Sequence, residues 1–189
     1  MQDRRPDPCL FEPHRWTREQ YERVVRLGGF EPDQRLELID GEIVDMAPQN
    51  EPHAVALCLL HDALRSAYGD GYVVRIQSPV ALDAGSAPEP DLAIVPGRPR
   101  DFLTSHPSNA VLLVEIADTT LAYDRSTKRV LYARNGVPEY WLVNLIEGVL
   151  EVYRNPQGSD YLEHRIVKKG ETLVPSEASR VVAVADLLP

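Results

Sequence analysis

Five ionisable side chains stand in segments of the sequence that are otherwise rich in apolar residues: Glu37, Glu42, Asp91, Glu115 and Lys128. Burial of an ionised side chain costs free energy unless hydrogen bonds or an opposite charge compensate it. A divalent metal ion is a partner that could unite the four acids. A metal ion combined with a lysine is a means of hydrolysing a phosphodiester. These residues therefore indicate where chemistry takes place if the fold brings them together.

The first two acids flank an Asp40-Gly41 pair, which predicts a β-hairpin with a two-residue turn. In such a hairpin Ile39 pairs with Glu42 and Glu37 pairs with Val44. Side chains alternate along each strand, so both acids project from one largely apolar face. This face is either the solvent side of an edge hairpin, or it directs one of the two acids into a site. Both Glu37 and Glu42 remain candidates.

The other two acids belong to strand-like segments. Glu115 lies in the run 111–116, where both faces are apolar, which indicates a strand buried on both sides. Asp91 opens the run 92–95, which could pair beside the strand of Glu115. Two carboxylates on adjacent strands can share one Mg²⁺ ion, with water and a substrate phosphate as its other ligands. The alternatives are a structural Glu115 with satisfied hydrogen bonds and a Pro-Asp turn at Asp91.

Lys128 is one of only three lysines among 20 basic residues, the others being arginine. It lies on or beside the apolar side of a helix that we expect at 121–135. Its alternative role is a helical pair with Asp124, worth only about 0.3–0.5 kcal/mol. His53 lies in the first turn of another expected helix. It either packs as a core histidine or contacts phosphate and assists proton transfer.

The composition is that of one globular domain spanning residues 1–189, with 43% hydrophobic and 26% charged residues. No apolar run approaches the roughly 18 residues that span a bilayer, and the N-terminus has no apolar stretch typical of a signal peptide. Cys9 and Cys58 are far apart and fit reduced thiols, so we expect a cytoplasmic protein without a membrane partner. The net charge of −9 is unusual for a nucleic-acid enzyme, although acidic metal ligands account for part of it.

The hydrophobic pattern predicts an α/β (α+β) fold with a mixed sheet. Residues 1–15 form an irregular arm, and Thr17 begins a first helix with a capping box to Gln20. Two further helices are expected at 52–68 and 121–135. Strands are expected at 72–77 with a continuation at 80–82, and at 92–95, 111–116, 139–145, 150–154 and 161–167. Residues 156–189 form a C-terminal β extension, and a hairpin turns near 155–158.

The chain resembles the Uma family of bacterial proteins, which are described as restriction-endonuclease-like. This family is a branch of the PD-(D/E)XK nuclease superfamily. The likeness covers roughly residues 17–155. It rests on LELIDGE at 36–42, PDL at 90–92, LVEIADTT at 113–120, YDR at 123–125 followed by Lys128, and YARNGVPEYWLV at 132–143. The resemblance implies a restriction-endonuclease-like fold, a central mixed β-sheet flanked by helices, with an additional N-terminal helix and β-hairpins.

By this resemblance Asp91 is the aspartate of the "PD" pair and Glu115 is the acid of the (D/E)XK strand. The superfamily pattern has a lysine two residues after that acid, where this chain has Ala117. The resemblance suggests that Lys128 supplies the ammonium group from the following helix instead. We then expect Asp91 and Glu115 to bind Mg²⁺ or Mn²⁺, with Glu37 or Glu42 as a further ligand or as the partner of a ligand.

The expected function is that of a metal-dependent endonuclease acting on nucleic acid, with DNA favoured over RNA, and by analogy as a homodimer. Arg125 and Arg129 either meet the nucleic-acid backbone or form a solvated helix face. Two other functions remain open. One is a non-catalytic nucleic-acid-binding or assembly protein on the same fold. The other is a metal-dependent hydrolase of a small phosphorylated molecule, which the acidic net charge favours.

Overall fold

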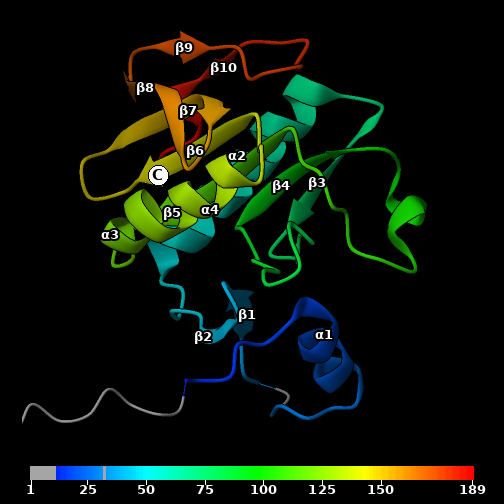
Figure 1. The fold of residues 1–189 in the computed structure, drawn as a ribbon. Coiled ribbons are helices and arrows are strands. Elements are labelled where there is room, and N and C mark those ends of the chain that lie inside the picture. Colours follow the sequence, from blue (N-terminus) through cyan, green and yellow to red (C-terminus); the bar gives the residue numbers. More distant parts are fainter. Residues whose placement is uncertain (1–11, 32) are drawn as a thin grey trace, which may run out of the picture.

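The computed structural model describes residues 12–31 and 33–189, and most of the expected arm at 1–15 lies outside these ranges. Its centre is a six-stranded sheet in the order β3-β4-β5-β6-β7-β8 (Figure 1). The strands are β3 (Tyr72–Ile76), β4 (Leu92–Pro96), β5 (Leu112–Ala117), β6 (Glu139–Asn144), β7 (Val149–Gln157) and β8 (Asp160–Lys168). Only β5 and β6 run parallel, and all other neighbours in this sheet are antiparallel. The predicted mixed sheet is therefore confirmed.

Helices cover the sheet on both faces. The helix α2 (Glu51–Tyr68) packs on one face, where its Leu60 and Leu64 join Leu112 and Val114 of β5 in a core. The other face is covered by the crossover between β5 and β6, which a parallel pair requires. This crossover contains α3 (Leu121–Tyr123) and α4 (Arg129–Arg134). Every residue of β5 is buried, as its apolar sequence predicts.

The helical crossover is not one regular helix at 121–135, as we expected. Its residues Asp124–Lys128 form a π-helical turn between α3 and α4. Such a turn accommodates one extra residue in a helix and occurs frequently at functional sites. Asp124 and Lys128 lie at the two ends of this turn, and both side chains are buried. The hydrophobic spacing of the sequence could not reveal the insertion, because the flanking segments still follow a helical period.

The N-terminal lobe comprises α1 (Arg18–Arg26) and the two-stranded sheet of β1 (Leu36–Ile39) and β2 (Glu42–Asp45), which lie together beside the main body (Figure 1). The predicted capping box of α1 is present. The hairpin has the predicted register, with Ile39 opposite Glu42. A separate small core of Tyr21, Leu38 and Ala87 holds the lobe together. A backbone bridge between Leu38 and Ala87 joins the hairpin to the loop before β4.

The predicted strand continuation at 80–82 is wrong. Gln77 adopts a left-handed backbone with φ of 42°, which turns the chain out of the sheet directly after β3. Backbone hydrogen bonds from Val80 to Pro88 and from Ala81 to Pro107 then hold this segment as a loop. A β-branched and aliphatic run does not distinguish an extended loop from a strand, because both require only extended backbone.

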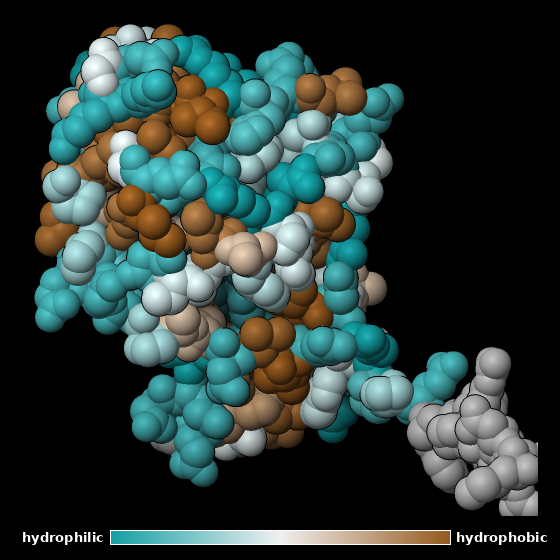
Figure 2. All heavy atoms as spheres, turned by 90° about the vertical axis from the view of Figure 1, so that its left-hand side faces the viewer, coloured by the Kyte–Doolittle hydropathy of each residue, from teal (hydrophilic) through white to brown (hydrophobic). Residues whose placement is uncertain are grey.

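The C-terminal part extends the fold with β9 (Thr172–Leu173), β10 (Val182–Ala183) and a short 3₁₀ turn at Val184–Asp186. Strands β7 and β8 are longer than predicted and turn around Gly158, beyond Pro156. Pro156 stays within the ladder, at the end of the hairpin near the turn. In the described part of the chain, no helix combines the length and the apolar composition needed to cross a membrane. Hydrophilic residues dominate the face seen in Figure 2, with hydrophobic ones in scattered groups.

Candidate active site

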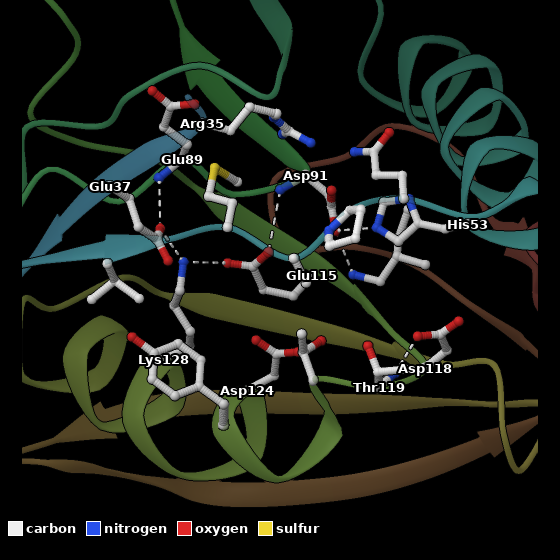
Figure 3. A pocket seen from close by; sticks show the side chains of 18 of the residues that line it. Arg35, Glu37, His53, Glu89, Asp91, Glu115, Asp118, Thr119, Asp124 and Lys128 are labelled. Atoms are coloured by element: carbon white, nitrogen blue, oxygen red, sulfur yellow. Dashed lines mark hydrogen bonds and ion pairs between the residues drawn. The ribbon is translucent and has the colours of Figure 1, made fainter. Parts of the chain in front are cut away.

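A cavity of about 220 Å³ lies between the N-terminal lobe and the main body. In Figure 2 the surface is hollowed between these two parts. The cavity brings together five of the six predicted site residues: Glu37, His53, Asp91, Glu115 and Lys128. They come from β1, α2, the residue directly before β4, β5 and the π turn (Figure 3). Segments far apart in the sequence thus meet at one point, as the sequence analysis required.

Glu42 is the exception. Its side chain is exposed and forms an ion pair with Arg15, and it is not among the residues that line the cavity. Glu37, by contrast, is only 4% exposed. Both acids belong to one face of the hairpin, but the Glu42 side chain turns to Arg15 at the surface, although Ile39 opposite it is buried. The structure therefore places Glu37 in the site and leaves Glu42 outside it.

Lys128 is buried and lies between two carboxylates (Figure 3). Its Nζ is 2.5 Å from Glu37 Oε2 and 3.3 Å from Glu115 Oε1. Burial alone would lower the pKa of Lys128, but the charges of Glu115 and Glu37 raise it above its ordinary value, so the ammonium group stays charged. The predicted helical partner Asp124 forms no ion pair with Lys128 among the residues that the structure describes.

Glu115 is surrounded by donors and by other acids. The hydroxyl of Tyr132 donates to its Oε1 at 2.5 Å, and the backbone N–H of Asp91 donates to its Oε2 at 3.3 Å. Burial raises its pKa from 4.5 to about 8, Lys128 opposes this rise, and the charges of Asp124, Asp91 and Glu37 add to it. The cavity therefore holds more negative charge than its own cations neutralise.

Asp91 is fixed by three different groups. The backbone N–H of Ile116 donates to its Oδ2 at 2.8 Å, and the amide of Gln77 donates to its Oδ1 at 3.0 Å. His53 Nε2 lies 3.1 Å from the same Oδ2. The Nδ1 atom of His53 is buried and has no hydrogen-bond partner among the described residues. His53 is thus a neighbour of Asp91, and it reaches the cavity from the first turn of α2.

Asp124 is a site residue that the sequence analysis considered only as a partner of Lys128. It is buried, lines the cavity and accepts a hydrogen bond from the Thr120 hydroxyl at 2.6 Å. Burial raises its pKa from 3.8 to about 6, although Thr120 and Lys128 oppose the rise. The signal available in the sequence was its place in the stretch at 123–125 that resembles the Uma family.

The predicted arginines on the crossover do not turn toward this cavity. Arg125 donates to Glu151 through Nε at 3.0 Å and through Nη2 at 2.6 Å, and it also contacts Glu147. Arg129 pairs with Asp160 at the end of the β7–β8 hairpin. Both guanidinium groups therefore hold the crossover to the sheet. We had expected them either to contact the nucleic-acid backbone or to form a solvated helix face.

The donor set fits a loosely held Mg²⁺ or Mn²⁺ ion. Asp91 and Glu115 present hard carboxylate oxygens, and Asp91 Oδ1 and Glu115 Oε2 each accept a single hydrogen bond. Each oxygen has two acceptor positions, so one remains on both atoms. Among the described residues, no three His, Cys, Asp or Glu side chains converge as a ready-made cage. Mg²⁺ suits such a site, since it retains water and uses one or two carboxylates, whereas Zn²⁺ requires three or four protein ligands.

Comparison with known proteins decides the family. The family model described as "Uma2: Putative restriction endonuclease" matches residues 18–185. The chain belongs to this family. A solved structure, a "putative nuclease belonging to DUF820" from Anabaena variabilis ATCC 29413, has the same fold with a TM-score of 0.70. At 18% sequence identity, the match covers 90% of this chain and 96% of that one. No curated protein matches the chain.

Membership of the Uma2 family confirms the resemblance stated from the sequence, and the shared fold confirms the fold class. The departure from the PD-(D/E)XK spacing now has a structural explanation. Ala117, two residues after Glu115, is fully buried at the end of β5. Lys128 approaches Glu115 from the π turn instead, so the ammonium group comes from the helical crossover rather than from the strand.

Proposed function

We propose that this Uma2 protein is a metal-dependent endonuclease that hydrolyses phosphodiester bonds in nucleic acid, with DNA favoured over RNA. One observation carries the proposal: the Lys128 ammonium lies 3.3 Å from Glu115, whose carboxylate is bonded to the backbone of Asp91, in a cavity that opens to solvent. Two metal-ligating oxygens and a cation beside them are the elements that phosphodiester hydrolysis needs. A cytoplasmic location and a homodimer that cuts both strands belong to the same proposal.

Asp91 and Glu115 would hold the ion, which when bound neutralises phosphate charge and lowers the pKa of the attacking water. Their side chains are already oriented by Gln77, Ile116 and Tyr132. Such preorganisation reduces the reorganisation needed as the reaction proceeds.

Lys128 would stabilise the charge that develops on the phosphoryl oxygens or position the water. Its ammonium group remains protonated at neutral pH, because the neighbouring acids raise its pKa. It therefore serves as a fixed charge and not as the base. His53, whose Nε2 lies 3.1 Å from Asp91 Oδ2, would contact the phosphate or assist proton transfer. Glu37 would hold Lys128 in place from the N-terminal lobe.

The proposal is tested by incubating the protein with supercoiled plasmid, single-stranded DNA and RNA in millimolar Mg²⁺ or Mn²⁺. We expect metal-dependent cleavage of at least one substrate. Asp91→Ala and Lys128→Ala should abolish it, whereas Glu42→Ala, which alters an acid of the same hairpin outside the cavity, should cut like the parent. Cleavage that survives in both Asp91→Ala and Lys128→Ala would contradict the proposal.

The two alternative functions give different results in the same assays. Binding of nucleic acid without cleavage in either metal indicates an assembly or binding protein. Hydrolysis confined to free nucleotides or other small phosphate esters indicates the small-molecule hydrolase, which the net charge of −9 favours.

A further inference from the structure

The excess of acidic side chains in the cavity repels any substrate that carries phosphate. Among the described residues, seven carboxylates line it, but only one lysine and one arginine. Lys128 is already paired with Glu37 and Glu115 before a substrate enters. One divalent ion would offset two of the acids. A phosphodiester entering this cavity therefore needs a further cation that is not already engaged.

Arg35 is in the right place and is not engaged. It directly precedes β1 and enters the cavity from the N-terminal lobe, opposite the helical crossover that carries Lys128 (Figure 3). Its side chain forms no hydrogen bond or ion pair with any part of the chain that the structure describes, in contrast to Lys128.

Arg35 also stands at the boundary of a second cavity. This neighbouring cavity has a volume of about 610 Å³ and is lined by Arg35 and Glu89 together with Tyr21, Phe30 and Leu36. A polymer must continue beyond the bond that is cut, and this second cavity offers such a path. The guanidinium group suits the boundary, because its planar donors bind phosphate through two parallel hydrogen bonds.

We propose that Arg35 is a substrate-binding residue that holds a backbone phosphate of the nucleic-acid strand as it enters the catalytic cavity. The inference rests on the proposed nuclease function and adds a substrate contact to it. Arg35 provides positive charge that offsets the repulsion between the acids of the cavity and a phosphate. It directs the strand toward the second cavity, which Tyr21 of α1 also lines. It contributes to binding more than to the chemical step, because its side chain forms no hydrogen bond or ion pair with Asp91 or Glu115 in the described structure.

The experiment compares Arg35→Ala, Arg35→Lys and Arg35→Gln with Arg100→Ala, which removes an exposed arginine outside both cavities. Cleavage kinetics are measured on the DNA that the parent cuts, and binding of the same labelled DNA is measured with Ca²⁺ replacing Mg²⁺. For Arg35→Ala we expect KM and Kd to rise roughly tenfold, with kcat within about threefold, as for the loss of one charged hydrogen-bonded contact. Arg35→Lys should recover part of the binding.

Salt dependence gives a readout that a merely structural role would not change. The slope of log K against log salt concentration should become shallower by about one in Arg35→Ala and Arg35→Gln, as expected when one phosphate contact is lost. In Arg100→Ala the slope should stay that of the parent. Melting temperatures of all variants should agree with the parent, because Arg35 has no side-chain partner to lose.

The outcomes separate the two proposals. If the parent cuts DNA but the Arg35 variants match Arg100→Ala in KM, Kd and salt slope, the role of Arg35 is refuted and the nuclease function stands. If the parent neither binds nor cuts nucleic acid, both proposals fall. If the Arg35 variants lose stability and Arg35→Lys restores stability without restoring the salt slope, Arg35 is structural and the inference is overturned.

Discussion

Glu115 and Glu151 are two buried glutamates that flank one residue of the central sheet. Leu142 of β6 pairs with Glu115 of β5 on one side and with Glu151 of β7 on the other. Residues paired across a sheet project from the same face, so both carboxylates point toward the helical crossover. Their exposed fractions are similar, at 6% and 1%. What differs between them is the chemistry of their neighbours.

Glu151 is surrounded by donors. Arg125 approaches it with two nitrogens, Tyr153 donates its hydroxyl at 2.8 Å, and the Asn144 amide donates at 3.1 Å. Burial alone would raise the pKa of Glu151, but these hydrogen bonds lower it below its ordinary value. Glu115 receives fewer donors and faces other acids, and its pKa rises to about 8. Burial is therefore common to both carboxylates, whereas uncompensated negative charge surrounds Glu115, the residue that the proposed function uses.

The largest expected effect is on cleavage. Glu115→Gln should reduce metal-dependent cleavage by roughly 10³-fold, because losing a ligand removes several kcal/mol of transition-state stabilisation. Glu151→Gln should leave the cleavage rate per folded molecule within about threefold of the parent. Single-turnover assays normalised to folded protein check both values. Equal losses in the two variants would remove the functional distinction between the two acids.

The next effect is on stability, where the Glu151 variant should lose more than the Glu115 variant. Glu151→Ala should lower the free energy of unfolding by about 3 kcal/mol, since it leaves the Arg125 guanidinium without its buried partner. Glu115→Gln should not lower it and should raise it near neutral pH, because the acid surplus falls and Lys128 keeps Glu37. Urea unfolding in EDTA measures both. A larger loss for Glu115→Gln would assign that residue a structural role.

The pH dependence of stability should also differ. The folded protein keeps a proton on Glu115 between its ordinary pKa of 4.5 and about 8, whereas the unfolded chain releases it. The free energy of unfolding of the metal-free protein should therefore fall as pH rises through this window, by up to about 5 kcal/mol. Glu151 acts in the opposite direction, because its lowered pKa gives stability that is lost only as pH falls below 4.5.

This prediction is checked by urea unfolding at several pH values between 5 and 8, which lie inside the window set by Glu115. In Glu115→Gln we expect a shallower fall, with the remainder due to Asp124, whose pKa is raised to about 6. An unchanged slope in Glu115→Gln would show that another group titrates in this range.

The smallest effect is on metal binding measured through stability. At a Mn²⁺ concentration tenfold above its Kd, the free energy of unfolding of the parent should rise by about 1.4 kcal/mol. Glu151→Gln should retain this gain, and Glu115→Gln should lose it. Thermal unfolding at fixed pH with and without Mn²⁺ provides the measurement. A gain of equal size in Glu115→Gln would place the ion elsewhere.

Sequence patterns predicted the sheet better than the site. The alternation of apolar and polar residues, the apolar runs and the turn residues identified the six strands of the sheet and the first two helices. These signals reflect local backbone preferences. The strand context made Asp91 and Glu115 candidates, and the resemblance at 90–92 and 113–120 then assigned their roles in the motif. Burial in an apolar strand could not have done so alone. Glu139 and Glu151 also stand in apolar strands and are buried, yet donors satisfy both.

Other features of the site depend on contacts that no local pattern records. Glu37 and Glu42 are equivalent in the hairpin pattern, and only the placement of the lobe against the main body directs Glu37 toward Lys128. Asp124 joins the cavity through the π turn, which leaves the helical period of its flanks unchanged. Arg35 became a candidate only when the partners of the other cations were known.

The π turn at Asp124–Lys128 also limits how this family can tolerate insertions and deletions. Removing one residue between Leu121 and Arg134 would restore an ordinary α-helix. Each residue in such a helix is rotated by about 100° about the helix axis relative to the one before it. The amine at 128 would then swing away from Glu115 while the rest of the crossover stayed helical. Length variation among relatives should therefore be rare in this stretch, and a relative one residue shorter should have lost its lysine or moved it.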